Sequence, residues 1–131
     1  MAKIERFEDL QSWQKARELA NSVYDLTDCQ KFAKDFQLRS QIQDAAGSVM
    51  HNIAEGFDAG TNLEFIRFLK ISRRSASEVQ SELYLALDRN YIDHDELSLA
   101  YNLATDTKRL INGMISYLRK STRKPHSQPT H

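Results

Sequence analysis

The sequence contains few residues that interrupt regular secondary structure. Only four glycines and two prolines occur among 131 residues, and both prolines, Pro125 and Pro129, lie within the last seven positions. This scarcity of breakers is typical of a chain built of long helices. The length suits one domain, which is large enough to bury a core without disulfide bonds.

The sequence also lacks paired cysteines, long apolar runs and an excess of either charge. Cys29 is the only cysteine, which excludes an intrachain disulfide framework and favours a reducing compartment. No stretch approaches the roughly 20 apolar residues of a membrane span, and the segment MAKIERFEDL does not have the pattern of a signal peptide. We therefore expect a cytoplasmic protein without membrane contact.

The balance of 18 basic and 18 acidic residues hides an asymmetry along the chain. Residues 1–66 carry seven basic and eleven acidic groups, a net charge of −4, whereas residues 67–131 carry eleven basic and seven acidic groups, a net charge of +4. The overall balance excludes a polyanion-binding field over the whole protein, and any polyanion contact is expected in the second half.

Apolar residues recur at helical spacing in four segments. Candidate N-caps precede them at Asp9, Asp35, Asn62 and either Asp93 or Asp95. Four helices of about 20–27 residues joined by short connections run antiparallel, which predicts an all-α fold, an up-down-up-down four-helix bundle. We assign this domain to residues 1–121, and residues 122–131 to a flexible, polar and basic C-terminal tail.

The helix predicted from Asn62 has apolar residues on more than one side. Its core stripe includes Phe65, Leu69 and Leu83, whereas other apolar side chains fall well outside this stripe at 100° per residue. Because one apolar face suffices to pack a monomeric bundle, we favour a subunit interface, with scattered surface hydrophobes as the alternative. The interface candidates are Phe68, Ile71, Ser75, Glu78, Glu82 and Leu85.

The segment HNIAEGF places an amide and a carboxylate near the end of the helix predicted from Asp35. Asn52 lies at the edge of the core stripe, and Glu55 lies on the same side. Half-buried polar groups must be paired, because an unpaired one costs roughly 1–3 kcal/mol. We therefore interpret these residues as part of a structural polar network. Its candidates are Gln41, Ser48, Asn52, Glu55, Ser75 and Glu78.

Basic side chains gather on one helix face and at the C-terminus. Spacings of three and four residues place Arg67, Lys70 and Arg74 on one face, and four more cations follow residue 118. A solvated helix face, together with cations favoured by the helix dipole, is the alternative to a polyanion-binding surface. The nucleic-acid-binding candidates are Arg67, Lys70, Arg73, Arg74, Arg119, Lys120, Arg123 and Lys124.

No pattern of catalytic or metal-ligating residues is present. The four histidines have no ligand spacing with one another or with Cys29, and there is no phosphate-binding glycine loop or hydrolase elbow. We therefore expect no enzymatic activity, no metal, no cofactor and no small-molecule substrate.

The motifs LRSQIQDAAGSVMHNIAEGF and LEFIRFLKISRRSASEVQSELYLALDRNYI resemble those of a known family. The similarity extends over roughly residues 5–120. The family comprises four-helix bundle proteins first noticed as reading frames in intervening sequences of bacterial 23S ribosomal RNA genes. The resemblance implies a left-handed bundle that assembles as a homopentamer, and an association with ribosomal RNA. A related branch, accessory proteins of diversity-generating retroelements, engages nucleic acid through a basic surface.

The sequence departs from the family at positions where many relatives carry arginine. These positions hold Gln43, Asp44, Asp58 and Ala59, which weakens a polyanion interpretation for that end of the bundle. Two functions from different classes remain. One is a non-catalytic, oligomeric nucleic-acid-binding or ribosome-associated protein, and the other is a ring-shaped scaffold for a protein partner.

Overall fold

The computed structural model describes residues 4–123, and they contain helices and no strand. The predicted all-α class is therefore confirmed, although the number of α-helices is five rather than four. The elements are the 3-10 helix η1 (Phe7–Asp9) and the α-helices α1 (Gln11–Thr27), α2 (Gln30–Lys34), α3 (Phe36–Phe57), α4 (Asn62–Asp88) and α5 (His94–Arg123). Of the predicted tail, residues 122 and 123 belong to α5, and residues 124–131 lie outside the described part.

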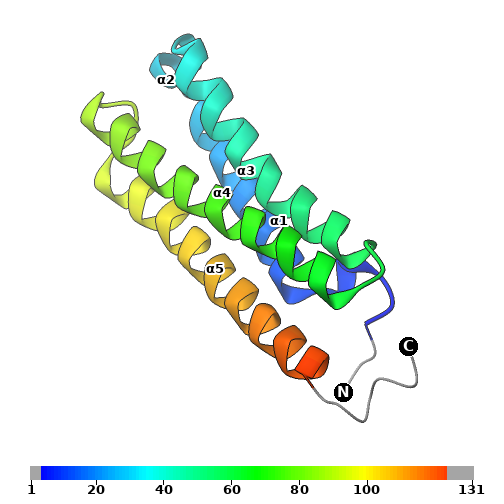
Figure 1. Ribbon diagram of the computed structural model, residues 1–131. Helices are drawn as coiled ribbons and strands as arrows, with labels where there is room; N and C mark the ends of the chain where they lie inside the picture. The colour runs from blue at the N-terminus through cyan, green and yellow to red at the C-terminus, as the bar shows by residue number, and fades with distance from the viewer. Residues whose placement is uncertain (1–3, 124–131) are drawn as a thin grey trace.

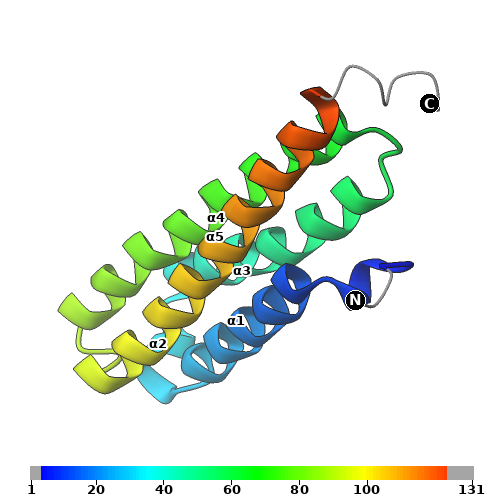
Figure 2. The same ribbon diagram turned by 90° about the horizontal axis from the view of Figure 1, so that it is seen from below.

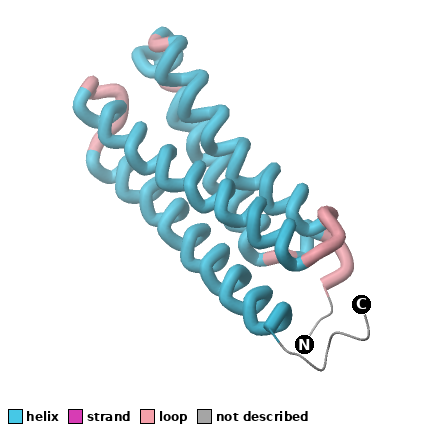
Figure 3. Tube along the Cα trace, in the orientation of Figure 1, coloured by secondary structure: helices cyan, strands magenta, loops and turns pink. Residues whose placement is uncertain are grey.

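The four long helices lie side by side, and short loops join them (Figures 1 and 3). α3 packs against α1 and α4, and α5 packs against α4 and α1, so the long helices enclose one core (Figure 2). The α3–α4 loop lies at the end of the molecule where α5 finishes (Figure 1). The α4–α5 loop lies at the opposite end, and so does α2.

Side-chain caps fix where three of the helices begin. Asp35 Oδ1 accepts a hydrogen bond from the Leu38 backbone N–H at 3.1 Å at the start of α3, and Thr61 Oγ1 accepts from the Glu64 N–H at 3.2 Å at the start of α4. Asp93 forms a reciprocal capping box with Glu96 before α5, with distances of 2.8 and 2.9 Å.

Two of the predicted caps lie elsewhere. Asn62 is the first residue of α4 rather than its cap. Asp9 ends η1, where its carboxylate accepts from the Glu5 and Arg6 backbone N–H groups, and α1 begins two residues later.

The short helix α2 was not predicted, because five residues are too few to show a helical period. It contributes Phe32, which is completely buried. The Phe32 ring stacks on Tyr91 with a centroid distance of 5.3 Å, and the Tyr91 hydroxyl donates to Asp35 Oδ2 at 2.9 Å. These contacts connect α2 to the loop between α4 and α5.

Gly56 sets a close approach between α3 and α4. It is buried within the last turn of α3, and the helix continues to Phe57. A Cβ atom at this position would lie 2.8 Å from Phe65 Cδ1 and 2.9 Å from Phe68 Cβ. Gly60, in the following loop, adopts the left-handed φ of 95° that favours glycine.

Candidate nucleic-acid interface

A groove between α4 and α5 collects basic side chains from both helices. Two adjoining hollows of about 500 and 280 Å³ form it, and both are lined by Arg73 and Asn112. Among residues 4–123, no acidic side chain lines either hollow. We call this surface the basic groove and define it by six cations: Lys70, Arg73, Arg74, Lys108, Arg119 and Lys120.

Arg73 is held in place across the basic groove. Its Nη1 donates to Asn112 Oδ1 at 2.7 Å, and the side chain is half-buried between α4 and α5. The guanidinium has five N–H donors, so this bond leaves others available for an anion. Asn112 is neutral, and the positive charge of Arg73 is therefore retained.

Lys108 is held in a similar way by neutral acceptors. Its Nζ donates to Gln80 Oε1 at 2.6 Å and to Ser77 Oγ at 3.2 Å. Gln80 is buried, and its Nε2 donates in turn to Thr105 Oγ1 at 2.9 Å and to the Tyr101 carbonyl at 3.2 Å. No carboxylate pairs with the Lys108 ammonium within the described residues, so its positive charge is not cancelled where Lys108 lines the groove.

The sequence analysis missed Lys108, although a signal for it exists. Lys108 precedes Asn112 by four residues and Arg119 by eleven, so all three lie on one side of α5 at 100° per residue. On this helix, the sequence analysis named only the cations after residue 118. The register of α5 against α4 cannot be read from either helix alone.

Of the eight predicted nucleic-acid-binding residues, five line the basic groove, and Arg67 does not. Arg67 pairs with Glu64 at 3.0 Å, and its guanidinium lies over the Phe68 ring, 4.5 Å from the centroid. This ion pair lowers the pKa of Glu64 and raises that of Arg67. Arg123 is the last residue of α5, where side chains are not described, and Lys124 lies outside the described residues.

A hydrogen-bonded cluster joins α3 to α4 near the predicted polar network. The hydroxyls of Ser48 and Ser75 lie 2.9 Å apart, and Asn52 Nδ2 donates to Ser48 Oγ at 2.9 Å and to the Ser48 carbonyl at 2.8 Å. Ser72, which sequence reasoning missed, donates from its buried hydroxyl to the Val49 carbonyl at 2.6 Å.

The other predicted members of the network lie outside this cluster. Gln41, Glu55 and Glu78 are exposed and make no side-chain hydrogen bond within residues 4–123. Near Glu55, the close approach at Gly56 brings Phe68 of α4 to this part of α3. The Phe68 side chain has no hydrogen-bond donor or acceptor for the Glu55 carboxylate.

Of the apolar residues that the sequence analysis placed outside the core stripe, Phe68 lies on the α3–α4 side, where its Cβ approaches Gly56. Phe68 and Ile71 are half-buried by their own chain, and Leu85 is 49% exposed. Ala86, which also falls outside the predicted stripe, is completely buried, because α4 packs against both α3 and α5. The buried surface of α4 is therefore wider than one stripe, and the exposed apolar part is correspondingly smaller.

Glu82 lies on the same side of α4 in an unfavourable environment. Its Oε1 is buried without a hydrogen-bond partner. Burial, followed by the charges of Glu78 and Asp44, raises the pKa of Glu82 from 4.5 to about 7. The folded protein therefore binds a proton at Glu82 more tightly than the unfolded chain does.

Replacing Glu82 with glutamine is expected to stabilise the protein at pH 8 and not at pH 4.5. Since the folded pKa is raised, the favourable contribution of the protonated group is complete below about pH 4.5 and is lost as the pH rises through about 7. The shift corresponds to about 3 kcal/mol in a dry site, and solvent screening at this half-buried position reduces the expected gain to about 1–2 kcal/mol.

Urea denaturation of the parent and of Glu82→Gln at both pH values measures this gain. Glu55→Gln is the matched control, because Glu55 is exposed and is not among the causes of the shift. An equal effect of Glu82→Gln at pH 4.5 and pH 8 would contradict the assignment.

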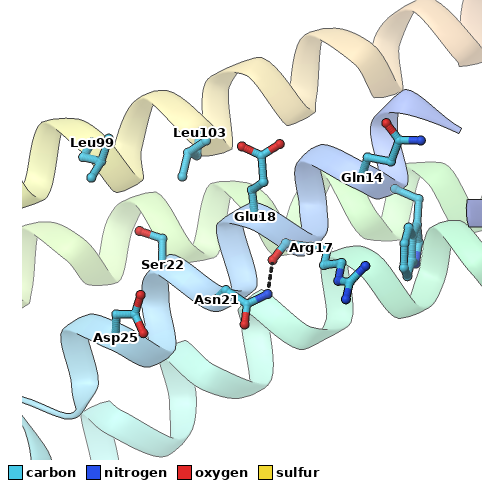
Figure 4. Close-up of a pocket in the computed structure, with 9 residues that line it drawn as sticks. Gln14, Arg17, Glu18, Asn21, Ser22, Asp25, Leu99 and Leu103 are labelled. Atoms are coloured by element: carbon cyan, nitrogen blue, oxygen red, sulfur yellow. Dashed lines mark hydrogen bonds between the residues drawn. The ribbon is translucent and has the colours of Figure 1, made fainter.

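A second groove, between α1 and α5, has a different chemical character (Figure 4). It has a volume of about 640 Å³, and Leu99 and Leu103 of α5 form one side of it. On the α1 side, the lining carries the cation Arg17 and the carboxylates of Glu18 and Asp25, with Arg17 and Asp25 at opposite ends of the row (Figure 4). This mixture of charges and apolar side chains does not suit a polyanion. Its full lining is Trp13, Gln14, Arg17, Glu18, Asn21, Ser22, Asp25, Leu99 and Leu103.

The family model of the 23S rRNA-intervening sequence protein matches residues 8–113. The chain belongs to this family. A solved structure described as a protein of unknown function from the S23 ribosomal protein family of Bacteroides thetaiotaomicron is similar, with a TM-score of 0.74 and 26% identity. The similarity covers 79% of this chain and 97% of that one. No curated protein matches the chain. The family resemblance noted in the sequence is confirmed.

Two of the residues expected to depart from the family pattern, Gln43 and Asp44, lie on α3. Gln43 donates from Nε2 to Thr27 Oγ1 at 2.9 Å, which links α3 to the end of α1. Asp44 contributes to the raised pKa of Glu82. Both positions are on α3, whereas the basic groove lies between α4 and α5.

The described residues contain neither a membrane-spanning helix nor a cluster of metal ligands. Within residues 4–123, no helix is long and apolar enough to cross a bilayer. Over the same residues, no group of three or more histidine, cysteine, aspartate or glutamate side chains is arranged to hold a metal ion.

Proposed function

We propose that this protein is a non-catalytic nucleic-acid-binding protein that contacts its ligand, RNA in the first place, through the basic groove. The observation that carries the proposal is the set of six cations on two facing helices, with no acidic side chain among the described residues of the lining. Neutralising phosphates with lysine and arginine supplies most of the affinity of non-specific nucleic-acid binding. Membership of the 23S rRNA-intervening sequence family makes ribosomal RNA the first ligand to test.

Titration of the purified protein against a ribosomal RNA fragment and single-stranded DNA, at 50 and 200 mM salt, tests the proposal. Binding should be detectable at 50 mM salt and markedly weaker at 200 mM, because counterion release makes phosphate contacts salt-dependent. Absence of binding at the lower salt concentration would overturn the proposal and would favour the ring-shaped scaffold for a protein partner.

The proposal includes the up-down-up-down, left-handed topology of the four long helices and their assembly as a homo-oligomer, a pentamer by family resemblance. Short loops and the packing of each long helix against its neighbours in the chain support the topology. Half-buried Phe68 and Ile71, together with exposed Leu85, support a subunit contact on the α3–α4 side.

Replacing Leu85 with aspartate is expected to shift the assembly toward smaller species, by about 1–2 kcal/mol per subunit contact. The change removes apolar area from the contact and adds a charge there, while the side chain is already 49% exposed within its own chain. Light scattering after size exclusion measures the mass. Leu99→Asp is the matched control, because Leu99 is 65% exposed on the α1–α5 side. An unchanged mass for Leu85→Asp would contradict the interface.

A further inference from the structure

We propose that the basic groove takes a single nucleic-acid strand rather than a duplex, with Lys108 and Arg73 as preset phosphate contacts and Gln80 as the positioning residue for Lys108. The inference rests on the proposed function, because it concerns the same groove. It adds the class of ligand, a phosphodiester strand without a paired partner, and it assigns a role to a buried glutamine that contacts no ligand itself.

The distribution of the cations favours one strand lying between the two helices. Lys70, Arg73 and Arg74 come from α4, and the remaining three come from α5. Packed helices have axes about 8–10 Å apart, so a backbone lying between them meets donors from both sides. A duplex has its second strand alongside the first, and it can approach such a narrow groove only from outside.

The row of cations that α5 contributes to the groove is straight, and we call it the track. It extends along α5 from Lys108 to Lys120, which is twelve residues, or about 18 Å at 1.5 Å per residue. The phosphates of a duplex strand wind around the duplex axis and leave a straight track after a short contact. An unpaired strand has no such constraint and can follow the track.

Gln80 presets the position of Lys108. Two of the three N–H donors of the ammonium are occupied by Gln80 and Ser77, and Gln80 is itself fixed by Thr105 and by the Tyr101 carbonyl. A lysine that is already ordered loses less side-chain entropy when it binds a phosphate. Because Gln80 is neutral, it orders the lysine without cancelling the charge.

The groove lacks a platform for base stacking, because none of the described residues that line it is aromatic. We therefore expect similar affinities for strands of different base composition. RNA and DNA strands share the phosphate chemistry that the groove recognises, and comparison of the two measures any contribution from the 2′-hydroxyl.

Fluorescence anisotropy with 12-nucleotide strands of oligo(U), oligo(A) and oligo(dT), and with a 12-base-pair RNA duplex, tests the ligand class. At 50 mM salt we expect the single strands to bind at least about fivefold more tightly than the duplex. Equal or tighter binding of the duplex would overturn the inference while leaving the proposed function intact. Absence of binding to all four ligands would overturn both.

Two substitutions of Gln80 test its positioning role. Gln80→Met removes the acceptor for Lys108, and we expect about three- to fivefold weaker binding with an unchanged slope of log K against log salt. Gln80→Glu keeps the acceptor but adds a carboxylate that pairs with the Lys108 ammonium. This change should lower the slope of log K against log salt by about 0.7, the value expected for the loss of one phosphate contact on a single strand.

Lys108→Gln is the companion variant at an accessible position, and we expect it to lower the slope in the same way. A merely structural role of Gln80 would change the fraction of active protein in a stoichiometric titration, and not the slopes. Parental affinity of Gln80→Met, or the same slope for the parent, Gln80→Glu and Lys108→Gln, would overturn the assignment.

Discussion

Replacing Arg73, Arg74 and Lys108 together with glutamine is expected to weaken binding to single-stranded nucleic acid by about 50-fold or more at 50 mM salt. All three side chains line the larger hollow of the basic groove, and none pairs with a carboxylate within residues 4–123. If each cation contributes about 1 kcal/mol, which is less than the roughly 1.5–3 kcal/mol of a hydrogen bond to a charged group, the sum of about 3 kcal/mol exceeds the roughly 2.3 kcal/mol of a 50-fold change. The slope of log K against log salt should fall by about 2, because three phosphate contacts are lost.

A second triple variant provides a control with the same change in net charge. Lys15, Arg67 and Arg109 form ion pairs with Glu18, Glu64 and Asp106 at 3.5, 3.0 and 3.7 Å. Their replacement with glutamine should change affinity less than fivefold, since their charges are already compensated locally and all three lie outside the basic groove. Equal losses for the two triple variants would show that affinity follows net charge rather than the groove.

Replacing Gly56 with alanine is expected to lower the free energy of unfolding, whereas the same change at Gly47 should not. The added methyl at Gly56 would lie 2.9 Å from Phe68 Cβ, an atom fixed to the α4 backbone, so relief requires α3 and α4 to move apart. Overpacking of this kind costs about 1–3 kcal/mol. At Gly47 the new methyl meets only His51, at 3.7 Å, and alanine there should gain about 0.5–1 kcal/mol from helix propensity.

Urea denaturation of the two glycine variants should therefore give unfolding free energies that differ by about 1–3 kcal/mol, the cost of the overpacking at residue 56. Both positions lie inside α3, so the comparison cancels the intrinsic preference of alanine for helix. Similar stabilities for the two variants would show that the interface between α3 and α4 absorbs the methyl group, and that the close approach does not restrict residue 56.

The positions of the long helices could be predicted from the sequence because their signals are local. The cap at Asp35 is used as predicted, and of the two caps predicted for the last helix, Asp93 is used. The start of α4 differs by one residue, since Thr61 caps it instead of Asn62. The helix α2 could not be predicted, because its formation depends on the burial of Phe32 against Tyr91, a residue 59 positions later.

The candidate site could be predicted only in part, because a groove between two helices depends on their relative register. Helical spacing alone predicted the α4 cations Lys70 and Arg74, and Arg73 was added because it lies beside them. Lys108 joins them only through contacts between α4 and α5, which no single-helix pattern contains. Arg67 is excluded by its pair with Glu64, which the spacing of three residues in the sequence could have indicated.

The partnerless carboxylate oxygen of Glu82 makes any contact on the α3–α4 side sensitive to proton exchange with the buffer. A neighbouring subunit that donates a hydrogen bond to this oxygen stabilises the anion, so assembly releases a proton at pH 7. A neighbour that only excludes water favours the neutral acid, so assembly takes up a proton. Calorimetric dilution in two buffers with different ionisation enthalpies distinguishes these cases by the sign of the difference in heat.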